Sequence, residues 1–388
     1  MAEPDEKPLV VIRSLVYNHE PYLRDCLEGF VMQQTTFPFV AVVHDDCSTD
    51  GSAAIIREYA EKYPHIIKPI YETENQYSKK DGSLCRVMDE ACGKYGAKYF
   101  APCEGDDYWT DPHKLQKQVD FLETHPDYTM VCSDAEVQTP EGLLTEEDFR
   151  KIGWPRYHTD KDIPAEDAIC LGGWFIHTAT IVYVSTLRDD YPEACKRCYT
   201  GDHTLQMFAA IKGNVRYIHE KTALYRWRMP GSWTARMTSS IIPETLIPKW
   251  KGKMDMFDSL DAYSGGKYRK AFRATQASYA LQYIAQSSGF EKKTVAELGY
   301  VLKYSYLRTV LPSSCKTVGG RLLHLIKRCC FHPYYPFVSC RHLINPILKP
   351  FYHVNWNKAG IKIGPVGVIT KVRQGAGKGV YLFGIKIR

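Results

Sequence analysis

The sequence predicts an α/β protein: a mostly parallel sheet flanked by helices, followed by a helical segment and a basic C-terminal extension. Over residues 8–135, short apolar runs rich in β-branched residues alternate with segments whose apolar residues recur at helical spacing. Such alternation is typical of parallel strands joined by helices that cover both faces of the sheet. The hydrophobic share of 44% and the charged share of 24% are those of an ordinary globular chain.

The first part of the chain is expected to alternate strands and helices in order. Strands are expected at 9–14, 39–43, 66–70, 98–103 and 128–132. The helix after the first strand has Pro21 in its first turn, where a missing amide donor costs little. Ser48 is expected to cap the helix after the second strand, and a further helix covers 82–93. Asp111 and Pro112 are expected to cap and begin the helix before the last of these strands.

Beyond residue 135 the pattern changes. Residues 136–170 are polar and loop-like, and 173–184 is expected to form another strand. A helix is expected from Gly201-Asp202 to Gly213, and short strands follow it at 215–218 and 222–226. The segment 252–308 has a helical pattern broken at Gly265-Gly266, and no fold is predicted beyond residue 312.

Charge is divided unequally along the chain. The formal net charge is +6, yet residues 301–388 hold 15 Lys and Arg and no Asp or Glu, so the rest of the chain has a net charge of −9. Together with the element pattern, this predicts an α/β domain over 1–250, a helical extension over 251–310 and a basic tail over 311–388. A basic tail beside an acidic body indicates an anionic partner.

Aromatic and apolar residues are interleaved with the basic residues of the tail, as in Leu322-Leu323, Phe331 and Tyr334-Tyr335. This mixture suits a segment that lies in the headgroup region of an anionic membrane, so residues 312–388 are expected to bind such a surface. Docking of the tail on the acidic body is the alternative. A nucleic-acid partner is ranked last because the acidic body would repel it.

The cysteine pattern and the N-terminus indicate a cytoplasmic protein. The 13 Cys are odd in number and irregularly spaced, and no leader-like segment opens the chain, so the thiols are expected to be reduced. Cys195 and Cys198 form a single Cys-x-x-Cys, which is a weak zinc signal without a second pair. The sequence has no apolar run of about 18 residues, the length that a spanning helix needs.

Two groups of carboxylates follow predicted strands. Asp45-Asp46 comes directly after the second strand, and Glu104-Gly105-Asp106-Asp107 comes directly after the fourth. Because ligands of such sheets bind beyond the carboxyl ends of the strands, the two groups are expected to converge on one crevice. Mg²⁺ and Mn²⁺ prefer carboxylate and phosphate oxygens, so these groups indicate a site for a metal-bound phosphate compound.

Three ordered motifs resemble family 2 glycosyltransferases, which have the GT-A fold. They are Leu9-Val10-Val11-Ile12 through Tyr17-Asn18, then His44-Asp45-Asp46-Cys47-Ser48-Thr49-Asp50-Gly51, then Glu104-Gly105-Asp106-Asp107-Tyr108-Trp109. The similarity is strong over about 8–135 and looser over 170–235. It implies an inverting, metal-dependent enzyme that moves a sugar from a nucleotide diphosphate, with uridine as the expected nucleoside, in bacterial cell-surface polysaccharide or lipopolysaccharide assembly.

The resemblance implies roles for the donor-binding residues. Tyr17 lies where the family packs the nucleoside base, and Asp46 matches the residue that hydrogen-bonds the base edge. Asp106 matches the carboxylate that binds Mg²⁺ or Mn²⁺. Glu104 stands where many members have the first Asp of an Asp-x-Asp motif, beside the donor ribose. Asp107 either shares the metal or shapes the turn.

It also implies roles on the acceptor side. Gly201-Asp202 resembles the segment with the catalytic base, and His177-Thr178 resembles a strand that lines the acceptor. Tyr225-Arg226 followed by Trp233 resembles the loop that folds over both substrates, with Arg226 facing the diphosphate. Many members have a His in this loop, but this chain has Trp227-Arg228. A saccharide or lipid-linked saccharide is the expected acceptor.

Simpler interpretations stand beside these roles. Asp45-Asp46 and Asp202 could be turn and cap residues, and His177 could be an ordinary core histidine. A sugar nucleotidyltransferase is a rival enzyme, but residues 8–22 lack the Gly that its triphosphate loop would need. A catalytically silent sugar-binding protein of the same fold is the rival from another class.

Overall fold

The computed structural model describes most of the chain up to residue 286 and short strands near its end. The described ranges are 7–79, 81–171, 175–198, 200–230, 232, 234–235, 243–286, 352–354, 360–363, 366–372, 379–382 and 385–387. The chain divides into two compact units, Met1–Thr275 and Gln276–Arg388. The division predicted at residue 250 stays a prediction.

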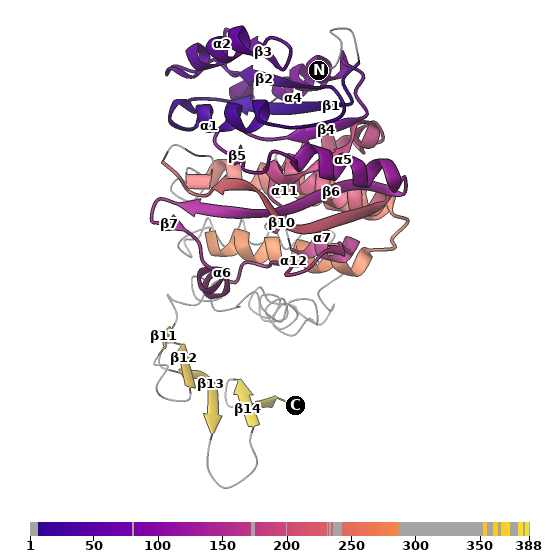
Figure 1. The fold of residues 1–388 in the computed structure, drawn as a ribbon. Coiled ribbons are helices and arrows are strands. Elements are labelled where there is room, and N and C mark those ends of the chain that lie inside the picture. The colour runs from indigo at the N-terminus through magenta and orange to yellow at the C-terminus, as the bar shows by residue number, and fades with distance from the viewer. Residues whose placement is uncertain are drawn as a thin grey trace. The chain divides into compact units, whose positions relative to one another are not determined.

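One ten-stranded mixed sheet organises the first unit, and its main path runs β3-β2-β1-β4-β9-β6-β10-β5. In that order the strands are Ile67–Tyr71, Phe39–Asp45, Val10–Val16, Tyr99–Pro102, Val182–Val184, Tyr128–Thr139, Asn214–Arg226 and Tyr108–Trp109. Two short strands, β7 (Gly142–Leu143) and β8 (Lys161–Asp162), pair with β6 and β10. In Figure 1 the indigo N-terminal strands lie at one end of the sheet, and β6 and β10 lie at the other.

The long strands of this sheet all run in one direction. β1 pairs in parallel with β2 and β4, β2 with β3, and β6 with β10. β9 is antiparallel to both β4 and β6, so it joins the two parallel halves without reversing them. The carboxyl ends of β1, β2, β4 and β10 therefore lie along the same edge, where ligands of open α/β sheets bind. This is the GT-A arrangement that the sequence predicts.

Helices connect the strands of the first unit. They are α1 (Glu20–Val31), α2 (Ser52–Lys62), α3 (Gln76–Lys79), α4 (Ser83–Gly93), α5 (Lys114–Thr124), α6 (Glu146–Ile152), α7 (Ala165–Cys170), α8 (Glu193–Lys196), α9 (Gly201–Lys212), α11 (Pro243–Tyr263) and α12 (Arg269–Gln286), with 3₁₀ turns at Thr178–Thr180 and Ser185–Arg188. The apolar face predicted for α1 is buried, and Pro21 lies in its first turn as expected. The apolar residues predicted to face inward on α5 and α9 are buried as well.

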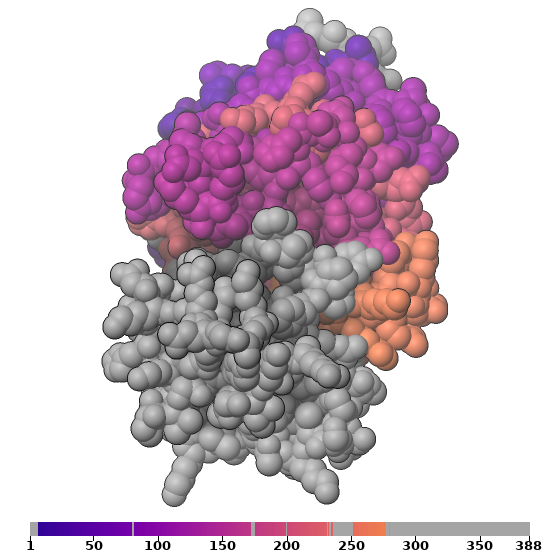
Figure 2. Space-filling view, turned by 90° about the horizontal axis from the view of Figure 1, so that it is seen from below, coloured from indigo at the N-terminus to yellow at the C-terminus, as the bar shows by residue number. Residues whose placement is uncertain are grey.

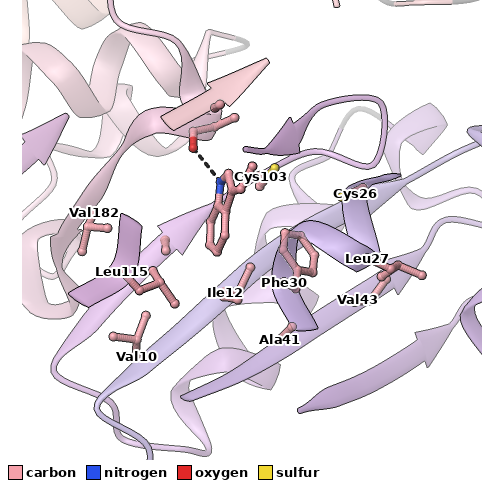
Figure 3. Packing of buried hydrophobic residues seen from close by; sticks show 14 of the residues in the cluster. Val10, Ile12, Cys26, Leu27, Phe30, Ala41, Val43, Cys103, Leu115 and Val182 are labelled. Atoms are coloured by element: carbon pink, nitrogen blue, oxygen red, sulfur yellow. Dashed lines mark hydrogen bonds between the residues drawn. The ribbon is translucent and has the colours of Figure 1, made fainter. Parts of the chain in front are cut away.

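The core lies between β1, β2 and the helices that cover them. Alternate residues of β1, Val10 and Ile12, pack with Ala41 of β2 and Phe30 of α1 (Figure 3). Trp109 of β5 completes this core, because its ring meets Phe30 edge-on at 5.1 Å and its Nε1 donates to the Ala179 carbonyl at 2.7 Å. The core thus joins β5, which follows the acidic turn, to α1.

Helix α11 and the part of α12 up to Thr275 extend the first unit beyond the sheet. Phe257 of α11 packs against His203 of α9 with ring centroids 6.1 Å apart. In α12, Thr275 Oγ1 donates to the Ile169 carbonyl of α7 at 3.0 Å. The orange surface of these helices borders the magenta surface of earlier residues in Figure 2. The break between them falls at Gly265 and Gly266, both with positive φ, as predicted.

Three predicted elements are wrong in type or extent. Residues 136–170 are not a loop, because β6 continues to Thr139 and α6 and α7 follow. Of the strand predicted at 173–184, the described residues 175–184 form only β9 at Val182–Val184, after a 3₁₀ turn. The two strands predicted at 215–218 and 222–226 are one strand, β10, whose register shifts around Lys221. Such bulges break the alternation that marks a continuous strand.

Two predicted helix caps are also wrong. The helix after the second strand begins at Ser52 with Gly51 at the N-cap, and Ser48 Oγ instead accepts a hydrogen bond from Asn18 N at 2.9 Å. Helix α5 begins at Lys114 with His113 at the N-cap. The carboxylate of Asp111 accepts from His113 N at 2.9 Å, so it shapes the preceding turn.

The described part of the second unit contains an antiparallel sheet. Its five strands run in sequence order as β11-β12-β13-β14-β15, at Tyr352–Val354, Gly360–Ile363, Val366–Val372, Gly379–Leu382 and Ile385–Ile387. The helical pattern expected over 287–308 and the apolar residues of 322–337 lie outside the described residues. Among the described helices, none is both long and apolar enough to cross a membrane.

Candidate active site

The end of β1 holds both groups of carboxylates in place. Asp46 N donates to the Val16 carbonyl at 2.9 Å, and Gly105 N donates to the Leu15 carbonyl at 2.9 Å. The loops after β2 and β4 are therefore hydrogen-bonded to consecutive residues of the strand between them. The predicted convergence of the two groups at one sheet edge is confirmed.

The loop after β1 is interlocked with the loop after β2. Asn18 and Cys47 both have positive φ, at 58° and 62°, which non-glycine residues adopt at some cost. Asn18 Oδ1 accepts a hydrogen bond from Thr49 N at 2.7 Å, and Gly51 N donates to Glu20 Oε2 at 2.7 Å. These bonds fix Tyr17, whose side chain is 36% exposed, beside the Asp45-Asp46 pair.

Asp46 is buried and holds the start of helix α3. Its two carboxylate oxygens accept hydrogen bonds from Gln76 N at 2.6 Å and Tyr77 N at 3.0 Å, and its carbonyl accepts from Asn75 Nδ2 at 3.0 Å. Each carboxylate oxygen has a second lone pair, so it can still accept a hydrogen bond from the edge of a nucleoside base. Asp46 thus connects the ends of β2 and β3, and its nucleoside role stays a prediction.

The acidic turn requires Gly105 for space. Asp107 N donates to the Glu104 carbonyl at 3.0 Å, which closes the turn. A Cβ at residue 105 would lie 2.8 Å from His19 Nδ1 and 2.9 Å from Val16 Cγ2, closer than such contacts normally come. The absence of a side chain at Gly105 therefore brings Glu104 and Asp106 up against the end of β1.

Arg226, at the end of β10, is bonded to the other side of this turn. Its backbone N donates to Asp107 Oδ1 at 2.8 Å, and its Nη1 donates to the Asp106 carbonyl at 2.8 Å. Its Nη2 donates to Asp25 Oδ2 of α1 at 2.5 Å. Asp107 is buried and its carboxylate is hydrogen-bonded to β10, while its sharing of a metal stays a prediction.

Two aromatic rings contact the Arg226 guanidinium. Its central carbon lies 4.8 Å from the ring centroids of both Tyr22 of α1 and Tyr108 of β5. The side chain is only 6% exposed. Arg228, by contrast, is exposed, has φ of 58° and lies over the Trp227 ring at 4.3 Å. Of the two arginines, Arg228 is the one whose guanidinium is open to solvent.

The charges of Asp106 and Asp202 act on the carboxylate of Glu104. Desolvation, followed by the charges of Asp106 and Asp202, raises the pKa of Glu104 to about 8. Because Glu104 is exposed to solvent, we use only the two charge contributions to this pKa shift, which show that Asp106 and Asp202 lie near Glu104. Burial and the charge of Asp106 also raise the pKa of Asp107 well above its usual range. Asp202 therefore lies within electrostatic reach of the acidic turn, although about 100 residues separate them in sequence.

Asp202 is not the cap of its helix. Thr200 occupies the N-cap of α9 and Asp202 is the second helical residue, with its side chain exposed. Its neighbours fix the helix: His203 Nε2 is 3.1 Å from the Ala168 carbonyl, and Gln206 Nε2 donates to the Ile176 carbonyl at 3.0 Å. The interpretation of Asp202 as a cap alone is therefore wrong.

A divalent cation fits this donor set only with help from a ligand. No described residue donates a hydrogen bond to the carboxylate oxygens of Glu104, Asp106 or Asp202. Within the described part of the chain, no three His, Cys, Asp or Glu side chains stand close enough to hold one ion by themselves. Mg²⁺ is commonly held by one or two carboxylates together with substrate phosphates and water, so the residues suit that mode of binding.

Comparison with known proteins decides the family. The family model described as glycosyl transferase family 2 matches residues 14–172. The uncharacterized protein Rv1520 of Mycobacterium tuberculosis is 32% identical over 282 residues, which cover 72% of this chain and 75% of that protein. The putative glycosyltransferase EpsE of Bacillus subtilis is 34% identical over 181 residues, covering 47% and 58%.

The chain belongs to glycosyltransferase family 2.

The solved structures agree on the fold. TarS 1–349 of S. aureus, in a crystal structure with UDP-GlcNAc, superimposes with a TM-score of 0.58 and 14% sequence identity over 96% of this chain and 98% of that one. Its complex with UDP gives a TM-score of 0.55. At this identity the likeness establishes the GT-A fold of the glycosyltransferase and nothing finer.

His177, which is predicted to line the acceptor, is buried in the structure. Its ring stacks on Tyr225 with centroids 4.7 Å apart and lies 5.6 Å from that of Trp154. Burial, helped by the charge of Arg156, lowers the pKa of His177 to about 3, so the ring is neutral. Its predicted acceptor role stays a prediction, and Trp233 lies outside the described residues.

The sequence did not single out several residues of this glycosyltransferase's site. Asp25 and Tyr22 lie one turn apart on α1, away from its buried face, and nothing local links them to Arg226. From the sequence, Tyr108 is named only as part of a motif and Tyr225 only as the first residue of a loop, and neither is assigned a role of its own. Their common signal is spatial, because Asp25, Tyr22 and Tyr108 contact the Arg226 side chain from α1 and β5. Tyr225 of β10 lies within electrostatic reach of the acidic turn.

Proposed function

We propose that this glycosyltransferase transfers a sugar from a nucleotide diphosphate donor, a UDP-sugar, to an acceptor hydroxyl with inversion of the anomeric configuration. The observation that supports this most is the convergence of Glu104, Asp106 and Asp202, three carboxylates with no described hydrogen-bond donor. Such a group suits a metal-bound diphosphate and a general base beside it. The named ligands UDP and UDP-GlcNAc of the structurally similar TarS support uridine as the nucleoside.

The donor-binding half of the mechanism uses the ends of β1, β2 and β4. Tyr17 would pack on the base and Asp46 would bond its edge, while Glu104 would lie beside the ribose. Bound at Asp106, Mg²⁺ or Mn²⁺ would neutralise the charge that develops on the departing diphosphate. We assign the arginine that faces this diphosphate to Arg228, because Arg226 already bonds Asp25 and Asp106.

The transfer step uses Asp202. Ionised, it accepts the proton of the acceptor hydroxyl as the oxygen attacks the anomeric carbon opposite the leaving group. One displacement inverts the configuration, so no side-chain nucleophile is needed. His177 and Trp233 are proposed to lie on the acceptor side. Positioned general-base catalysis contributes about 10²–10⁴-fold, so this is the loss expected when Asp202 cannot accept a proton.

We place the reaction in assembly of a bacterial cell-surface polysaccharide or lipopolysaccharide, in the cytoplasm and beside the membrane. Support comes from the name of a relative, a putative teichuronic acid biosynthesis glycosyltransferase of Bacillus subtilis that is 32% identical over 116 residues. A saccharide or lipid-linked saccharide is the proposed acceptor.

The test combines a donor screen with two variants. The full chain is assayed with Mn²⁺ against UDP-, GDP- and dTDP-sugars by donor turnover, and product configuration is determined by NMR. Asp202→Asn should keep Mn²⁺-dependent donor binding and lose about 10²–10⁴-fold in turnover. Asp106→Ala should lose the metal dependence of donor binding.

Asp189→Asn is the matched control, because it removes an exposed carboxylate from the turn after β9 and should leave turnover unchanged. Undiminished turnover in excess chelator would contradict the metal-dependent mechanism. Near wild-type turnover by Asp202→Asn would remove Asp202 from the mechanism. Donor binding without any turnover by the wild type would favour the silent sugar-binding alternative.

A further inference from the structure

Helix α3 begins on the carboxylate of Asp46. Gln76 N and Tyr77 N, the amides of the first two helical residues, donate to its two oxygens at 2.6 and 3.0 Å. The same carboxylate is proposed to bond the edge of the nucleoside base. Its orientation toward the base therefore depends on where α3 begins.

Glu72 connects the start of α3 to the end of β2. Its Oε2 accepts a hydrogen bond from Gln76 Nε2 at 3.0 Å, and its Oε1 lies 3.2 Å from His44 Nε2. Its backbone N donates to the Asp45 carbonyl at 3.0 Å. Glu72 is thus fixed to β2 through both its backbone and its side chain, and its second oxygen holds the side chain of the first residue of α3.

His44 is the unusual residue of this connection. It follows Val42 and Val43 on β2 and is fully buried, as they are. An ionised carboxylate only accepts hydrogen bonds, so His44 Nε2 is the donor to Glu72. Within the described part of the chain, the buried Nδ1 of this ring has no partner. An unpaired buried polar atom costs about 1–3 kcal/mol, so packing alone would favour an apolar residue here, and the bond to Glu72 is what the histidine adds.

We propose that Glu72, held by His44, is a positioning residue for nucleoside binding: it fixes the start of α3, which orients the Asp46 carboxylate toward the base edge. This inference rests on the proposed function and adds a residue that acts through Asp46. Both carboxylate oxygens of Glu72 are bonded within the protein, so we give Glu72 no contact with the donor.

The base half and the metal half of the site should respond differently to the loss of Glu72. β1 lies between β2, which leads to Asp46, and β4, which leads to the acidic turn. Displacement of α3 therefore acts on the base and not on a metal-bound diphosphate at that turn. A general loosening of the fold would weaken both.

Glu72→Met removes both side-chain bonds and keeps the side chain long. The full chain and the variant are titrated with UDP, GDP and ADP, and with inorganic pyrophosphate, each with Mn²⁺, by calorimetry. Hydrogen bonds to charged groups correspond to about a tenfold to hundredfold change in binding. Glu72→Met should weaken binding of whichever nucleoside diphosphate the wild type binds by that amount. Pyrophosphate binding should stay unchanged, because pyrophosphate has no base.

Two further variants make the result specific. Glu72→Gln can bond both neighbours, because glutamine donates as well as accepts and a neutral His44 ring can accept through Nε2 in its other tautomer. It should recover most of the affinity that Glu72→Met loses. Glu74→Met removes an exposed carboxylate from the same loop, where it pairs with Lys79, and should bind like the wild type.

Three results would each show the inference to be wrong while the proposed function stands. They are wild-type affinity of Glu72→Met for the nucleoside diphosphate, an equal loss of pyrophosphate binding, and no recovery by Glu72→Gln. If the wild type binds none of the three nucleoside diphosphates, the proposed function fails and this inference fails with it.

Discussion

A single arginine at the end of β10 joins three elements of the site. Arg226 bonds the Asp106 carbonyl and the Asp25 carboxylate, and its guanidinium contacts the rings of Tyr22 and Tyr108. A planar group with several fixed donors can satisfy all these contacts at once, whereas a lysine cannot. We therefore assign Arg226 a positioning role for the acidic turn, in place of the direct diphosphate contact that the family resemblance implies.

Arg226→Lys distinguishes these two roles. If Arg226 positions the turn, the variant should raise the Mn²⁺ concentration needed for half-maximal activity and lower turnover by about a hundredfold, because small misplacements of reacting groups have effects of that order. If Arg226 touched the diphosphate instead, lysine would retain much of the contact, and the donor KM alone would rise. Steady-state kinetics with Mn²⁺ and donor varied separately measures both quantities.

Arg24→Lys is the matched control for this prediction. Arg24 also lies on α1 and pairs with Glu58 through two hydrogen bonds at 2.9 and 2.7 Å, but both side chains are half exposed. Exposed pairs contribute little, so its kinetics should equal those of the wild type. An Mn²⁺ dependence of Arg226→Lys that matched the wild type would disprove the positioning role.

At the scale of elements, the site depends on how closely the acidic turn approaches β1. The Gly105 backbone bonds Leu15, and its α-carbon lies against His19 and Val16. The strand and the turn are rigid here because Asp107 is bonded to β10 on the other side. A side chain at residue 105 therefore has to displace the turn or the side chains of His19 and Val16.

Gly105→Ala should move the turn and lower both activity and stability. Overpacking of a tight contact costs about 1–3 kcal/mol, and chemical denaturation measures that loss. Metal-dependent donor binding should weaken in the same variant, because Glu104 and Asp106 flank the displaced residue. Wild-type stability together with wild-type metal dependence would show that this contact does not set the geometry of the site.

Gly201→Ala is the contrasting substitution next to the proposed base. A Cβ there meets no atom within 4 Å, and residue 201 is the first of helix α9. Alanine favours a helix over glycine by about 0.5–1 kcal/mol, so the variant should be as stable as the wild type or more so. Comparing Gly105→Ala with Gly201→Ala therefore separates the effect of a steric clash from the effect of replacing a glycine at the start of a helix.

At the scale of the whole molecule, the charge asymmetry remains the main unexplained feature. The last 88 residues have 15 basic and no acidic side chains, and their described part forms a five-stranded antiparallel sheet. Near an anionic membrane each basic residue contributes about 1 kcal/mol, so a few in contact would localise the enzyme. A membrane-bound enzyme would meet a lipid-linked acceptor at the same surface.

Liposome flotation tests this membrane role. The full chain should float with anionic vesicles at low salt and less so at high salt, because screening weakens the attraction. Deletion of 312–388 should abolish flotation while Mn²⁺-dependent donor binding is retained.

Replacing Lys362, Lys371 and Lys386 of the terminal sheet by Gln should weaken flotation without removing the segment. Asp106→Ala should float like the wild type, and absence of flotation at low salt would exclude the membrane role in favour of a tail docked on the acidic body.

The sequence by itself determined the parallel strands, their helices, the positions of Asp46 and Asp106 at strand ends and the position of Asp202 in the first turn of a helix. These features are local, because hydrophobic period and strand-end carboxylates depend on residues near one another in the chain. Local signals failed at β9 and at the bulged β10, where pairing with β4, β6 and β5 sets the structure. Ser48 and Asp111 were misplaced because a capping residue has other partners available in the folded protein.

Only the tertiary structure decided which side chains surround the acidic turn. Arg226 and Asp25 are 201 residues apart in sequence, and Tyr225 meets His177 through a stack between β10 and the segment before β9. No period or motif of the sequence contains such pairs, because they form only when the strands assemble in their spatial order. The sequence therefore identified the carboxylates of this glycosyltransferase, and the packing of β10 against α1, β5 and β6 selected the residues that hold them.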